Sequence, residues 1–94
     1  MILKDLLNHF EITENLPDYL LNHTFNEVFL DGKLTKSHNN YEIAVTTRQN
    51  VTHQMFIKPE DEFPLIIMSI LPNGLLNGMK FGRNVGEEIP INKL

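Results

Sequence analysis

The most hydrophobic stretch of the chain, Leu-Ile-Ile-Met-Ser-Ile-Leu at residues 65–71, constrains the fold more than any other feature. It is too short to cross a membrane, and its β-branched residues are typical of a strand that is buried on both faces. A buried helix entered through Pro64 is the alternative, but Ile66, Ile67 and Ile70 favour the strand. We therefore expect the other elements to pack around this segment.

Two helices are predicted ahead of any strand. Apolar residues at three-and-four spacing from Ile2 to Phe10 indicate one amphipathic helix. Asn15 has the side chain of an N-cap and Pro17 suits a first helical turn, so a second short helix is expected over residues 16–23.

From Phe25 onward the apolar period changes to two, which indicates strands. Strands are predicted at 27–30, 33–35, 41–47, 51–58, 79–81 and 87–91, and turns at Asp31-Gly32, 37–40, 48–50, 72–74 and Asn77-Gly78. The last strand is placed at a sheet edge, because Pro90 has no N–H to donate. The pattern predicts a single α+β domain over residues 1–94, with two short N-terminal helices packed on a mostly antiparallel sheet of about four to six strands.

Composition bears on compartment and source. The chain has no cysteine, and Lys4, Asp5 and Asn8 interrupt the apolar pattern that a signal peptide would need. We therefore expect a cytoplasmic protein that does not enter a membrane. Asn occurs eleven times and alanine once, a bias typical of AT-rich coding sequence in a low-GC bacterium, its phages or its plasmids.

Residues with catalytic or ligand-binding chemistry are scattered rather than arranged in a motif. His9, His23, His38 and His53 fall on four predicted elements, none at the spacing of a metal site. His53 alternates with core positions and is expected to be a hydrogen-bonded histidine at the edge of the core, while Ser69 is expected to pack or to bond locally. The acidic runs 60–62 and 87–88 are typical of solvated loops. We predict no catalytic residue, no metal and no cofactor.

Charge is distributed unevenly along the chain. Residues 1–31 carry a net charge of −5 and residues 32–58 a net charge of +3. Such a dipolar molecule is suited to steering protein partners and unsuited to broad contact with nucleic-acid phosphates. We expect a small non-catalytic protein-binding module, encoded by a phage or other mobile element, that regulates or inhibits a host nucleic-acid-handling protein. The predicted contacts with a basic protein partner are Asp5, Glu11, Glu14 and Asp18 on the two helices, with Arg48 at a hairpin tip as a second surface.

Three alternatives remain open. One is a small enzyme, which would need a concave pocket with two convergent polar groups of perturbed titration. Two helices followed by a hairpin that carries Lys33, Lys36 and Arg48 resemble a small winged-helix regulator, in which the strands bearing Tyr41 and Phe56 could stack bases. The acids of the predicted recognition region argue against this alternative. A homodimer is also possible, through the edge strand near Pro90 or the leucine-rich first helix.

Overall fold

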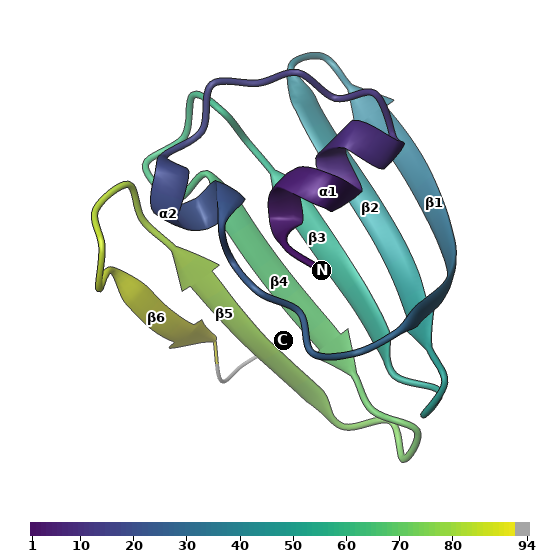
Figure 1. The fold of residues 1–94 in the computed structure, drawn as a ribbon. Coiled ribbons are helices and arrows are strands. Elements are labelled where there is room, and N and C mark those ends of the chain that lie inside the picture. The colour runs from purple at the N-terminus through teal and green to yellow at the C-terminus, as the bar shows by residue number, and fades with distance from the viewer. Residues whose placement is uncertain (92–94) are drawn as a thin grey trace.

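Six strands form one antiparallel sheet in the computed structural model, which describes residues 1–91 of the 94-residue chain. Strands that follow one another in the sequence are neighbours in the sheet, so the order is β1-β2-β3-β4-β5-β6 (Figure 1). The strands are β1 (Phe29–Ser37), β2 (Asn40–Thr47), β3 (Thr52–Ile57), β4 (Leu65–Ile70), β5 (Leu76–Phe81) and β6 (Glu88–Ile91). The apolar run is the strand β4, paired on both edges, so the strand was the correct choice over the helix.

The predicted α+β class is wrong, because helix makes up only 12% of the molecule and the fold is mostly β. The two helices are α1 (Leu3–His9) and α2 (Asp18–Leu21), and α2 is a single turn rather than the longer helix predicted over 16–23. Its N-cap is Pro17, which makes no side-chain cap, and the chain leaves the helix at Asn22. None of the helices within residues 1–91 has the length and hydropathy to cross a membrane.

Backbone pairing with the N-terminal segment explains why α2 stops. The N–H of Leu3 donates to the carbonyl of His23 at 2.9 Å, and the N–H of Phe25 donates to the carbonyl of Met1 at 2.8 Å. A bridge between Ile2 and Thr24 lies between these bonds. Residues 23–25 must be extended to make these bonds, and no local sequence pattern announces a pairing over this distance.

The core lies between α1 and one face of the sheet, which we call the helix side (Figure 1). Alternate residues of the central strands point to this side, because successive strand side chains alternate between faces. The buried residues are Leu3, Leu6, Leu7, Ile12, Leu16, Leu20, Phe25, Ile43, Val45, Met55, Ile57, Leu65, Ile67 and Phe81. The leucines of α1 are therefore buried in the core, so the prediction that they form a dimer interface is wrong.

Two predicted turns are strand instead, and both contain a glycine. Asp31-Gly32 lies inside β1 beside a register irregularity, and Asn77-Gly78 lies inside β5. A Cβ on Gly32 would come within 3.0 Å of Cζ of Phe10, and one on Gly78 within 2.8 Å of Sδ of Met68. These glycines permit a neighbouring side chain to lie against the strand, which is a different use of glycine from a turn.

Candidate functional site

Two hollows open on the helix side. The first, the β4–β5 hollow, lies between residues 23–27 and strands β4 and β5 and has a volume of about 400 Å³. It is lined by apolar Phe25, Ile67, Met79 and Phe81, by Gly78, and by polar His23, Thr24, Asn26, Glu27, His53, Ser69, Asn77 and Glu88. The second, the α1–β1 hollow, has a volume of about 480 Å³, and the polar residues that line it are Asp5, His9 and Asp31. Carboxylates thus line both hollows, and neither lining contains a Lys or an Arg.

A chain of hydrogen bonds, the Glu27–His53–Ser69 relay, forms one end of the β4–β5 hollow. Nδ1 of His53 lies 2.7 Å from Oγ of Ser69, and Nε2 lies 2.8 Å from Oε1 of Glu27. His53 and Ser69 are register partners on β3 and β4, both facing the helix side, and Glu27 comes from the segment before β1. The bonds are satisfied when Nε2–H donates to Glu27 and Nδ1 accepts from the Ser69 hydroxyl. His53, only 9% exposed, is therefore the hydrogen-bonded histidine at the core edge that the sequence predicts.

Serine, histidine and carboxylate in this order resemble the relay of a nucleophilic enzyme, in which a base activates the serine and a third group orients the base. Such enzymes also place donors, commonly backbone N–H groups, at the developing oxyanion. Ser69 sits inside β4, paired with His53 on one side and Asn77 on the other, so its own N–H belongs to the sheet ladder. Side chains with donor groups that line the same hollow are Thr24, Asn26 and Asn77. The two hydrogen bonds of the relay fasten the segment that carries Glu27 to β3 and β4.

His23 occupies the opposite end of the β4–β5 hollow. Its ring meets Phe25 and Phe81 edge-on, with centroids 4.9 Å and 5.2 Å apart. Burial lowers the pKa of His23 below its ordinary value, and the nearby carboxylate of Glu88 opposes this shift. The neutral form of the His23 imidazole is therefore favoured.

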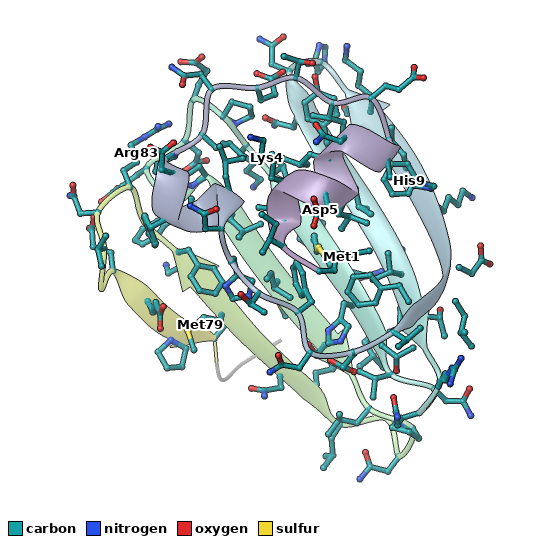
Figure 2. All side chains as sticks on the ribbon, viewed as in Figure 1. Met1, Lys4, Asp5, His9, Met79 and Arg83 are labelled. Carbon is teal, nitrogen blue, oxygen red and sulfur yellow. The ribbon has the colours of Figure 1, made fainter. Side chains whose placement is uncertain are left out.

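The predicted contact residues all lie on the helix side or along its rim. Asp5 is exposed on α1 (Figure 2), where Oδ2 accepts the N–H of Ile2 at 3.2 Å, and it joins Asp31 in the α1–β1 hollow. Glu11 is exposed directly after α1 with a φ of 58°, and Asp18 is exposed in the first turn of α2. These carboxylates form a belt along α1 and the connection to α2.

Glu14 differs from the rest of the belt because it is held in place. Its Oε1 accepts the hydroxyl of Tyr41 at 2.7 Å, which ties the α1–α2 connection to β2. This hydrogen bond, followed by burial and the charge of Glu14, raises the pKa of Tyr41. The Tyr41 hydroxyl therefore keeps its proton and continues to donate to the carboxylate.

Arg48 lies at the turn between β2 and β3, exposed, and lines a third hollow of about 370 Å³ together with Glu27 and Val28. The structure thus places Arg48 next to the segment that the relay fastens, although no sequence pattern connects the two. Glu27, Asp31 and Glu88 are the site residues that the sequence argument missed. The only available signal was their place within the excess of acids, because folding alone brings them to the hollows.

The residues proposed for nucleic-acid binding are spread over different faces. Tyr41 and Lys36 face the helix side, with Nζ of Lys36 5.6 Å from the Tyr41 ring centroid. Phe56 and Lys33 face the other side of the sheet, so the two aromatic rings do not form one stacking platform. Within residues 1–91, no three His, Asp or Glu side chains gather as metal ligands.

No protein-family model, curated protein or solved structure matches the chain.

Proposed function

We propose that the chain is a non-catalytic protein-binding module whose helix side receives a basic segment of a partner protein. The observation that carries the proposal is that carboxylates line both helix-side hollows with no Lys or Arg among the lining residues. The belt of Asp5, Glu11, Glu14 and Asp18 extends the same negative surface over α1 and its connection to α2.

The β4–β5 hollow has the chemistry to accept an arginine side chain. Phe25, Met79 and Phe81 supply an apolar wall for the methylene stem, and Glu27 and Glu88 supply carboxylates for the guanidinium. Arginine is also among the residues that dominate interface energies, because its planar head pairs with carboxylates while its stem packs.

The proposed role is a regulator or inhibitor of a nucleic-acid-handling protein in the cytoplasm of a low-GC bacterium, encoded by a mobile element. A phosphate-binding surface on that protein supplies the required basic segment. Covering it would exclude nucleic acid by steric and electrostatic occlusion, and charge steering would speed association.

Binding to an arginine-rich peptide, measured by fluorescence anisotropy, tests the proposal. We expect binding that weakens at least about tenfold between about 20 and 300 mM salt, because exposed charges are screened. Glu11→Lys and Glu88→Lys should each weaken it several-fold. Glu42→Lys makes the same charge change on the opposite side of the sheet and should leave it unchanged.

Two results would count against this assignment. If Glu42→Lys weakened peptide binding as much as Glu11→Lys, the peptide would be responding to net charge and not to the helix side. A gel shift of duplex DNA at low salt, lost when Lys33, Lys36 and Arg48 are neutralised, would instead favour the winged-helix-like regulator.

A further inference from the structure

The face of the sheet opposite α1, the outer face, is rich in apolar side chains that no described element covers. Register pairs place one set of alternate residues on it, from β1 across to β6. Its apolar members are Ala44, Phe56, Ile66, Met68, Ile70, Leu76, Ile89 and Ile91. Leu76 and Ile89 are 49% and 43% exposed. A contiguous apolar surface of this kind is typical of an interaction site.

Two opposite charges lie symmetrically about the centre of this face. One row of register partners crosses the outer face in the order Thr35, Glu42, Phe56, Ile66, Lys80 and Ile89. Glu42 on β2 and Lys80 on β5 are three strands apart, about 14 Å, so they do not pair within one chain. The ammonium of Lys80 lies instead 4.4 Å from the Phe63 ring centroid, and neither residue has an ion-pair partner within residues 1–91.

We propose that a second copy of the chain covers the outer face, related by a two-fold axis that runs between β3 and β4 along the strands. Rotation about this axis preserves position along the strands and reverses their order, so β2 of one copy faces β5 of the other and β3 faces β4. Glu42 then meets Lys80 of the partner subunit twice, once on each side of the axis. Phe56 meets Ile66 of the partner subunit at the centre, which is the sheet-on-sheet packing of a β-sandwich.

The charges of the inner strands select this axis over its neighbour. Lys33 on the edge strand β1 lies over Ile91 of the partner subunit at the rim, where the ammonium of a long side chain stays in water. An axis moved by one strand, between β4 and β5, would place Lys80 over Ile66 of the partner subunit and remove an ammonium from water without a counterion. The chosen axis also leaves both acidic helix sides on the outside of the dimer, far from each other. That separation limits repulsion between two chains that each carry a net charge of −4.

A charge swap tests the arrangement, with self-association measured by sedimentation equilibrium. The wild type should approach twice the 10.9 kDa chain mass as concentration rises. Glu42→Lys and Lys80→Glu should each weaken the dimer at least about tenfold, because each sets like charges against each other at both pairs. The double variant Glu42→Lys/Lys80→Glu exchanges the pair and should recover most of the affinity.

The controls separate this proposal from the proposed function. Glu11→Lys makes the same charge change on the helix side. It should leave the dimer intact while it weakens binding of the basic peptide. Since the two residues are about 14 Å apart within a chain, recovery in the double variant reports contact between subunits. A wild type that stays monomeric at every concentration, or a double variant as weak as either single variant, would overturn the arrangement.

Discussion

At the scale of single residues, the Glu27–His53–Ser69 relay joins three segments that are far apart in the sequence. His53 is 9% exposed, and each of its ring nitrogens has a hydrogen-bond partner. Its partners come from a strand sixteen residues later and a segment twenty-six residues earlier. Nothing in their spacing marks them as a group, because the register of β3 on β4 and the path of residues 25–28 decide the contact.

The relay predicts a specific cost for Ser69→Ala. Nδ1 of the buried His53 would lose its partner, so the free energy of unfolding should fall by about 1 kcal/mol. Urea denaturation measures this change, and Ser37→Ala at the exposed end of β1 serves as the control, expected within about 0.5 kcal/mol of the wild type.

Two outcomes would contradict this view of the relay. Equal stability of Ser69→Ala and Ser37→Ala would mean that the bond to His53 does not fasten the sheet. Covalent labelling of Ser69 by a fluorophosphonate, lost on His53→Gln, would show an activated nucleophile and overturn the non-catalytic proposal.

At the scale of elements, the period of the apolar residues predicts where the strands lie, but the glycines inside β1 and β5 were wrongly predicted as turns. The hairpin of β2 and β3 and the strand β4 follow from alternation and from β-branched residues, which are properties of the strands themselves. Gly32 follows Asp and Gly78 follows Asn, and both dipeptides predict a turn. Their actual role depends on Phe10 and Met68, which lie against them from other elements, and a local pattern carries no such information.

The close contact between Gly32 and Phe10 predicts an interaction that a double-mutant cycle can measure. Gly32→Ala places a Cβ 3.0 Å from Cζ of Phe10 and should lower the free energy of unfolding by about 1–2 kcal/mol. Phe10→Ala removes that neighbour, so adding Gly32→Ala to it should cost about 1 kcal/mol less than adding it to the wild type. Strictly additive costs in urea denaturation would show that Phe10 is not what requires a glycine at this position.

At the scale of the whole molecule, the charge asymmetry of the sequence becomes a difference between two sides of a sheet. Most acids of residues 1–31 gather on or around the helix side, while the outer face combines apolar residues with Lys33, Glu42 and Lys80. The asymmetry could be read from the sequence. The outer face could not, because its apolar residues share their strands with the core, and only the register separates the two sets.

Opposite locations for the two proposed surfaces predict that they act independently. Isothermal titration of the dimer should give one basic peptide bound per chain, since both helix sides remain open. Peptide affinity should be the same for the wild-type dimer and for monomeric Glu42→Lys. A stoichiometry of one peptide per two chains would mean that the partner subunit obstructs a helix side.

The placement of α1 also has a consequence for biosynthesis. The ribosome makes α1 before every strand, yet Leu3, Leu6 and Leu7 are buried in the same core as residues of β2, β3 and β4. The apolar face of α1 in a nascent chain therefore lacks its partner strands until β4 has emerged from the ribosome. Translation speed through the middle of the message sets how long that helix is open to chaperones or to neighbouring nascent chains.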